Sequence, residues 1–198
     1  KVFQIGVGGD FIYSSEHNND IPAGQTTLPL LRDNFIYKDA RLDLAWLKLS
    51  PFHLLSVQGG RFFMPVRFTE MIWDRDLRPQ GGALTLALRD RGALKRLAVT
   101  GLGARGSHVF DGDVTTMISG ALDATFALDE SWRLQLVGSF TTFLDPDELE
   151  AKIRRQNTRV AGVIVKDYHV VDAIVRLRRG GSFPVQVVAD GCLNTAVD

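Results

Sequence analysis

Residues 34–49 of this chain read NFIYKDARLDLAWLKL, and side chains of one kind recur at every second position. One set of alternate positions is apolar and contains Ile36, Ala40, Leu42, Leu44 and Trp46. The other set carries charge and contains Asp39, Arg41, Asp43 and then Ala45. A period of two places each set on its own face of a β-strand, whereas an amphipathic helix repeats at three and four. We therefore predict a strand with one apolar face and one charged face.

The length of this alternation indicates which kind of sheet the strand belongs to. A strand of a soluble protein has about 5–6 residues, whereas a tilted strand needs about 9–11 residues to cross a bilayer. The alternation in residues 34–49 has the length of a strand that crosses a bilayer. An apolar face behind a face charged in both signs is typical of a barrel with lipid outside and water inside. The segment therefore predicts an all-β fold, an antiparallel up-and-down transmembrane β-barrel.

Similar runs recur along the chain and predict about ten strands. We place them at 2–13, 34–49, 54–63, 83–89, 95–105, 114–128, 132–140, 159–166, 170–177 and 183–188. The connections between them run alternately long and short, and only the hairpin at Gly180-Gly181 breaks the alternation. Up-and-down barrels of the outer membrane have short periplasmic turns and long outer loops. The connections therefore favour the same architecture as the strands.

Residues 145–158 interrupt the β pattern. Asp145 suits a helix N-cap and Pro146 the first helical position. Acidic residues come first and basic residues last, which complements the helix dipole. We expect a short helix inside a long loop.

Composition excludes several classes of protein. Lys and Arg number 23 and Asp and Glu number 23, which argues against a nucleic-acid binder with a broad basic surface. The sequence contains no run of 18 apolar residues, so it predicts no transmembrane helix. Cys192 is the single cysteine and the four histidines are far apart, so we predict no metal and no cofactor.

Both ends of the sequence bear on its domain organisation. The chain opens at Lys1 directly in a strand-like pattern, and it ends without the aromatic residue on which outer-membrane barrels commonly finish. We expect residues 1–198 to be a single, incomplete β-barrel domain, part of a longer chain.

Two groups of charged residues are candidates for a site. The period of two assigns one group to the face opposite the apolar face, as lumen charges: Arg41, Asp43, Asp123, Arg133, Asp172 and Arg176. The second group runs from the end of the predicted strand 54–63 into the long connection 64–82 and resembles a charged constriction: Arg61, Arg67, Glu70, Asp74, Arg75, Asp76 and Arg78. Rings of charged side chains tune which ions pass through a pore. The alternative for the second group is a solvated loop with ordinary surface ion pairs.

The chain resembles the outer-membrane porins of Gram-negative bacteria. The resemblance rests on Arg41-Leu42-Asp43-Leu44, Gly60-Arg61-Phe62, Pro65, Glu70, Trp73-Asp74 and Gly81-Gly82, and it covers about the first half of the chain. It implies a pore of about 16–18 strands, often a homotrimer, that passes small hydrophilic solutes across the bacterial outer membrane. The strands visible here are too few to close such a pore.

Three functions remain open from the sequence. The first is a passive diffusion channel for small hydrophilic solutes or ions, which is not an enzyme, since no nucleophile or histidine lies near the carboxylates of 64–82. The second is a non-conducting, structural barrel that is plugged by its loops and binds partners through them. The third is a soluble all-β protein whose apolar faces form a closed core. The direction of the apolar faces, outward to lipid or inward to a core, separates the third from the first two.

Overall fold

The computed structural model describes the backbone of residues 2–11, 40–69, 78–105, 115–144, 159–160, 163–164 and 168–196. It describes the side chains of all of these except 9–11, 40–43, 159–160 and 163–164. Nine strands form one antiparallel sheet whose order follows the chain. They are β1 (Val2–Phe11), β2 (Ala40–Phe52), β3 (Leu55–Arg61), β4 (Gln80–Arg91), β5 (Leu94–Arg105), β6 (Thr116–Ala127), β7 (Trp132–Leu144), β10 (His169–Arg179) and β11 (Val185–Asn194). The prediction of an all-β, up-and-down antiparallel fold is confirmed.

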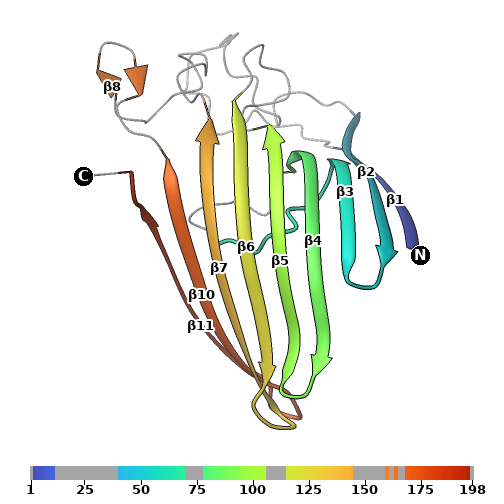
Figure 1. Ribbon diagram of the computed structural model, residues 1–198, viewed down its shortest axis with the longest axis vertical. Helices are drawn as coiled ribbons and strands as arrows, with labels where there is room; N and C mark the ends of the chain where they lie inside the picture. Colours follow the sequence, from blue (N-terminus) through green and yellow to red (C-terminus); the bar gives the residue numbers. More distant parts are fainter. Residues whose placement is uncertain are drawn as a thin grey trace.

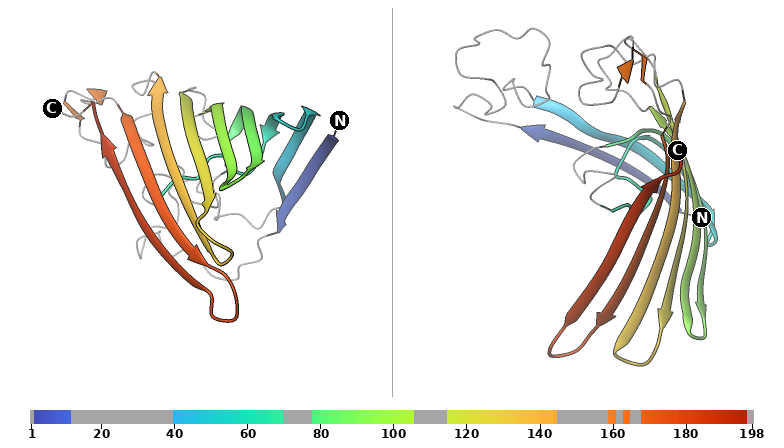
Figure 2. Two further views of the ribbon diagram at one scale, coloured as in Figure 1. Left: turned by 60° about the horizontal axis from the view of Figure 1, so that its bottom comes forward. Right: turned by 90° about the vertical axis from the view of Figure 1, so that its left-hand side faces the viewer.

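The sheet curves into an open trough and does not close into a barrel (Figure 1, Figure 2). Among the described strands, β1 pairs only with β2, and β11 pairs only with β10. The segment that follows β3 lies on the concave side of the trough (Figure 2). We call this concave side the inner face and the convex side the outer face.

The connections within the sheet alternate between short and long without exception. The short turns, at 53–54, 92–93, 128–131 and 180–184, follow β2, β4, β6 and β10. All four therefore lie at the same end of the antiparallel sheet (Figure 1). The longer segments 12–39, 62–79, 106–115 and 145–168 join strand ends at the opposite end.

The prediction of a sheet strand at 159–166 is wrong. The described residues of this segment form two strands of two residues, β8 (Arg159–Val160) and β9 (Val163–Ile164), which pair with each other and not with the main sheet. The main sheet therefore has nine described strands, and 145–168 is a single connection. This correction removes the exception that the sequence placed at Gly180-Gly181. The helix predicted at 145–158 lies outside the described residues.

Local chemistry explains the tight reversals at the short turns. Asp90 and Gly92 have φ of 53° and 64°, the left-handed conformation that tight hairpin turns require. The Asp129 carboxylate accepts hydrogen bonds from the backbone N–H groups of Ser131 and Trp132, both at 2.7 Å, as in an Asx turn. The N–H of Gly180 donates to the carbonyl of Ser131 at 2.8 Å, which joins two neighbouring turns.

The register of the strands gives the two faces opposite compositions. Large apolar side chains occupy the outer positions along the strands and are exposed, among them Phe3, Ile5, Val7, Leu47, Leu49, Val57, Leu84, Leu86, Val99, Ile118, Leu122, Leu136, Phe140, Val171, Val175, Val187 and Leu193. In the described part of the chain no second layer covers them. The inner positions alternate with these and are mostly polar, charged or small.

The predicted faces of residues 34–49 are wrong for Leu44, Ala45 and Trp46. The pairing of β1 with β2 shifts register between Gly8 and Gly9, opposite Leu44 and Leu42. Beyond this bulge Leu47 is exposed on the outer face, and Trp46 is partly buried against the core of the inner face. A bulge adds one residue to one strand and so exchanges the faces of the residues that follow. Periodicity alone could not locate that extra residue.

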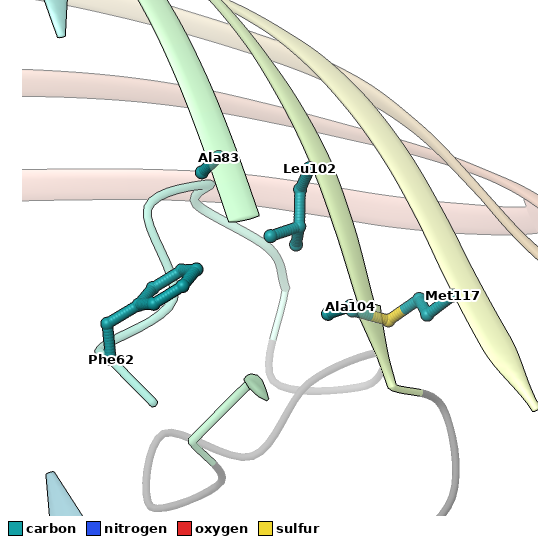
Figure 3. Close-up of a cluster of buried hydrophobic side chains, with 5 residues drawn as sticks. All are labelled: Phe62, Ala83, Leu102, Ala104 and Met117. Carbon is teal, nitrogen blue, oxygen red and sulfur yellow. The ribbon is translucent and has the colours of Figure 1, made fainter. Parts of the chain in front are cut away.

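A small hydrophobic cluster lies on the inner face, towards the ends of the strands that bear the longer connections (Figure 3). It consists of Phe62, Ala83, Leu102, Ala104 and Met117, with Trp46, Met64 and Phe143 packed against it. Phe62 is fully buried, and it comes from the segment after β3 and not from a strand. The small side chains of the two alanines leave room for its ring. The cluster therefore attaches this segment to the sheet.

Candidate functional site

The candidate site is the inner face together with residues 62–69, which we call the inward loop. Gly60 makes the departure from β3 possible, because its φ is 112° and a Cβ there would overlap the carbonyl oxygen of Ala45. The base of the connection is closed by the N–H of Phe62, which donates to the carbonyl of Pro79 at 3.1 Å. Val66 and Thr69 are buried further along the loop. The loop therefore packs on the sheet and does not project from it.

The end of the inward loop is anchored on β10. The backbone N–H of Thr69 donates to Oδ2 of Asp172 at 3.0 Å, across 103 positions of sequence. Asp172 is 2% exposed, and Ser139 opposite it on β7 is also buried. Among the described residues, Asp172 Oδ1 and the hydroxyls of Thr69 and Ser139 have no hydrogen-bond partner. A buried carboxylate is costly unless it is hydrogen-bonded, so the Thr69 bond is a main support of this group.

A second contact between loop and sheet is centred on Asp123 of β6. Its carboxylate pairs with Arg96 of β5 and accepts a hydrogen bond from Gln135 Nε2 at 2.9 Å. Arg67 of the loop approaches the same carboxylate, with 3.8 Å from Nε to Oδ2, and donates to Gln135 Oε1 at 3.4 Å. Gln135 also accepts from Arg176 Nη1 at 3.1 Å. The loop therefore crosses from β3 and β4 to β6, β7 and β10, over the floor of the trough.

Hydroxyl groups line the inner face between these contacts. The Oγ1 atoms of Thr85 and Thr100 lie 3.0 Å apart across β4 and β5. Thr141 Oγ1 donates to Ser119 Oγ at 2.9 Å, and Ser119 Oγ donates to the carbonyl of Phe140 at 3.1 Å. The inner face is therefore a hydrogen-bonding surface, in contrast to the apolar outer face.

The predicted lumen charges whose side chains are described all lie on the inner face. Asp123 and Asp172 are buried there, Arg176 is partly buried, and Arg133 is exposed near the short-turn end of β7. Arg41 and Asp43 belong to β2, but their side chains lie outside the described part. The period of two was therefore sufficient to place the four described side chains on one face.

The predicted constriction residues are only partly described. Arg67 lies among the inner-face charges, and the guanidinium carbon of Arg78 lies 4.4 Å from the centre of the Phe63 ring. Arg61 ends β3 and is partly buried. The remaining candidates, Glu70, Asp74, Arg75 and Asp76, lie outside the described residues.

Sequence reasoning missed the three basic residues that line a hollow of about 450 Å³ beside the inward loop: Lys48, Arg89 and Arg96. Arg89 could have been found, because it continues the alternation of Thr85 and Ala87 opposite Leu84, Leu86 and Leu88. The bulge in the pairing of β1 with β2 places Lys48 on the inner face, and the period of two in the sequence does not show that bulge.

Other kinds of site have no support in the described residues. No three His, Cys, Asp or Glu side chains among them gather as a metal site would require. Cys192 is exposed on β11. In the part of the chain that the structure describes, no helical segment has the length and apolarity that crossing a membrane requires. No family model, no curated protein and no solved structure matches this chain.

Proposed function

We propose that this chain forms part of the wall of a transmembrane β-barrel in the bacterial outer membrane, and that small hydrophilic solutes or ions diffuse passively along its inner face. The observation that carries this proposal is the contrast between the two faces of one sheet. The outer face is apolar across all nine strands, and the inner face bears hydroxyls, carboxylates and guanidinium groups.

The apolar outer face supports contact with lipid. Monomeric soluble proteins rarely expose contiguous apolar patches larger than a few hundred Å². Here Leu84, Leu122 and Val175, on three different strands, are 47%, 49% and 45% exposed. A bilayer core removes such side chains from water, at about 25 cal/mol per Å² of buried apolar area. Eight of the nine strands have 10–13 residues, and about 9–11 suffice for a tilted crossing.

Closure of the barrel requires partners for the two free edges. Among the described strands, β1 and β11 each have one side without a partner. The backbone N–H and C=O groups on such a side cannot face hydrocarbon without large cost. Further strands that pair with both edges would satisfy them and enclose the inner face. The strict alternation of short and long connections is that of an up-and-down barrel. A homotrimer of such barrels is the assembly that we propose.

Planar bilayer recording tests the proposal. The natural, full-length protein, extracted in detergent and added to a bilayer, should produce discrete conductance steps. Folded protein that inserts into the bilayer and never conducts would contradict the diffusion pore. Protein that remains soluble and monodisperse without detergent would contradict membrane insertion as well.

A second candidate function is a non-conducting barrel that the inward loop plugs. The contacts of this loop with Asp123 and Asp172 favour it, because they hold the loop across the inner face. The same recordings separate the two functions. A plugged barrel is silent as the wild type and conducts after deletion of residues 63–78, whereas an open pore conducts in both forms.

A further inference from the structure

The hollow beside the inward loop has a volume of about 450 Å³ and lies against the inner positions of β1 to β5. Met64 and Pro65 of the loop border it, and the turn at 53–54 lies at its other end. Among the described residues, its charged lining residues are Lys48, Arg89 and Arg96, and none of its lining residues is an Asp or Glu. The described lining thus carries charge of one sign.

The positive charge of the hollow is only partly compensated. Arg96 pairs with Asp123, which lies outside the lining. No hydrogen bond or ion pair joins the side chains of Lys48 or Arg89 to another residue in the described part of the chain. Arg89 lies directly opposite Arg96 across β4 and β5. Of these two adjacent guanidinium groups only that of Arg96 is paired with a carboxylate, so positive charge remains directed into the hollow.

The cationic surface continues beyond the hollow towards β10. In the register of the sheet, Arg96 is followed by Thr125, Gln135 and Arg176 on successive strands. Arg133 lies opposite Arg178 near the short turns. The buried carboxylates of the inner face, Asp123 and Asp172, are already bound by Arg96 and by the inward loop. The short-turn half of the inner face is therefore predominantly basic.

The rest of the lining suits a small organic anion. Trp46 and Phe63 offer aromatic surface, and Gln4, Gln58 and Thr85 offer hydrogen-bonding groups. A single guanidinium group matches the geometry of a carboxylate, which it binds through two parallel hydrogen bonds. An inorganic cation would find no negative partner among the described residues of this lining.

We propose that this hollow is a binding site for small organic anions that carry a carboxylate, and that it makes the solute route anion-selective. The position of the hollow on a solute route rests on the proposed function; its affinity for anions does not. A one-sign charge in a cleft with low-dielectric walls raises the local concentration of counter-ions. Charged side chains along a pore select ions by sign in the same way.

Collisional quenching of Trp46 fluorescence tests the hollow without any need for conduction. With all other tryptophans replaced by Phe, iodide and caesium quenching are compared with those of free N-acetyltryptophanamide. We expect the iodide-to-caesium ratio to exceed that of the free reference. Arg89→Glu should lower the ratio at least about twofold, and Lys95→Glu, exposed in the same hairpin but outside the lining, should leave it unchanged. A ratio equal to the reference, or an equal response to both variants, would overturn the proposal.

Zero-current potentials in a potassium chloride gradient test the route. We expect a chloride-to-potassium permeability ratio above one, which Arg89→Glu lowers about 2–5-fold and Lys95→Glu does not. Benzoate, a small carboxylate, should reduce the chloride current saturably in the wild type and not in Arg89→Glu. A cation-selective pore would overturn this inference and leave the diffusion pore intact. Absence of any conductance contradicts the proposed function instead, and the Trp46 measurement then decides the anion site by itself.

Discussion

The backbone N–H of Thr69 lies 3.0 Å from the carboxylate of Asp172, although 103 positions separate the two residues in sequence. This hydrogen bond ties the end of the inward loop to the far side of the trough. The loop begins at β3 and reaches β10, and it passes Asp123 and Gln135 on the way. Whether the inner face is an open route or a plugged one depends on how firmly this loop is held.

Loss of the Asp172 anchor should free the inward loop. We expect Asp172→Ala to lower the free energy of unfolding by about 1–3 kcal/mol, the cost of leaving the buried N–H of Thr69 without its acceptor. Single-channel recordings should show a larger or noisier conductance. Asp190→Ala removes the same charge from the next strand, where Asp190 is exposed, and serves as the control. Equal effects of the two variants would show that charge, and not the anchor, is responsible.

Gly60 should not tolerate a side chain. Its φ of 112° is strained for other residues, and a Cβ would overlap the Ala45 carbonyl. We expect Gly60→Ala to destabilise the protein by at least about 1–3 kcal/mol, measured by urea unfolding in detergent or lipid. At the neighbouring Gly59 a Cβ would come no nearer than 3.8 Å to its closest neighbour, the Gly81 carbonyl. Gly59→Ala should therefore be close to neutral, and a similar loss in both variants would contradict the role of Gly60.

The two arginines that approach Asp123 should differ in their effect on stability. Arg96 pairs directly with the buried carboxylate, whereas the side chain of Arg67 is 55% exposed and lies 3.8 Å away. Arg96→Met should cost about 2–3 kcal/mol, because it removes the main partner of a buried charge. Arg67→Met should cost less than about 1 kcal/mol. Urea unfolding of the two variants, of Asp123→Asn and of the two double variants would give the coupling energy of each pair; equal couplings would contradict this assignment.

Adjacent valines of β11 provide a matched test of the two faces. Val187 lies on the outer face and Val188 on the inner face, and both are exposed. In lipid, Val187→Arg should destabilise the folded protein by on the order of 1–3 kcal/mol, between the values for the membrane surface and its midplane. Val188→Arg should cost less than about 1 kcal/mol, because its side chain remains in water and only meets the like charge of Arg176 opposite it. Folding titrations in lipid vesicles measure both; equal costs would be incompatible with a lipid-facing outer surface.

Much of the sheet could be predicted from the sequence because a period of two is a local property. It located the nine strands to within a few residues in most cases, and it placed Asp123, Arg133, Asp172 and Arg176 on one face. It failed where a bulge in the β1–β2 pairing exchanged the faces of Leu44 and Trp46. It also failed at 159–166, where β8 and β9 are too short to join the sheet. A strand must also pair with a neighbouring strand, and the alternation of side chains does not show which segment that neighbour is.

The candidate site was less predictable because its contacts are distant in sequence. Nothing local to Thr69 or Asp172 indicates that they meet, since the curvature of the whole sheet brings them together. The basic lining of the hollow likewise combines Lys48, Arg89 and Arg96 from three strands. The mixed charges of 64–82 predict a constriction but do not show which residues of the sheet this connection contacts. In the described part, Arg67 and Thr69 of the inward loop contact Asp123, Gln135 and Asp172.

Spin-label accessibility along β4 tests most directly whether the outer face meets lipid and the inner face meets water. Single cysteines are introduced at positions 84 to 88 in a Cys192→Ser background, and each is spin-labelled in the lipid-embedded protein. The collision rate of each label is measured with oxygen and with a water-soluble nickel complex. Labels at Leu84, Leu86 and Leu88 should favour oxygen, which concentrates in lipid. Labels at Thr85 and Ala87, which line the hollow, should favour nickel. Nickel accessibility that is equal at all five positions, or higher at the leucines, would contradict the account.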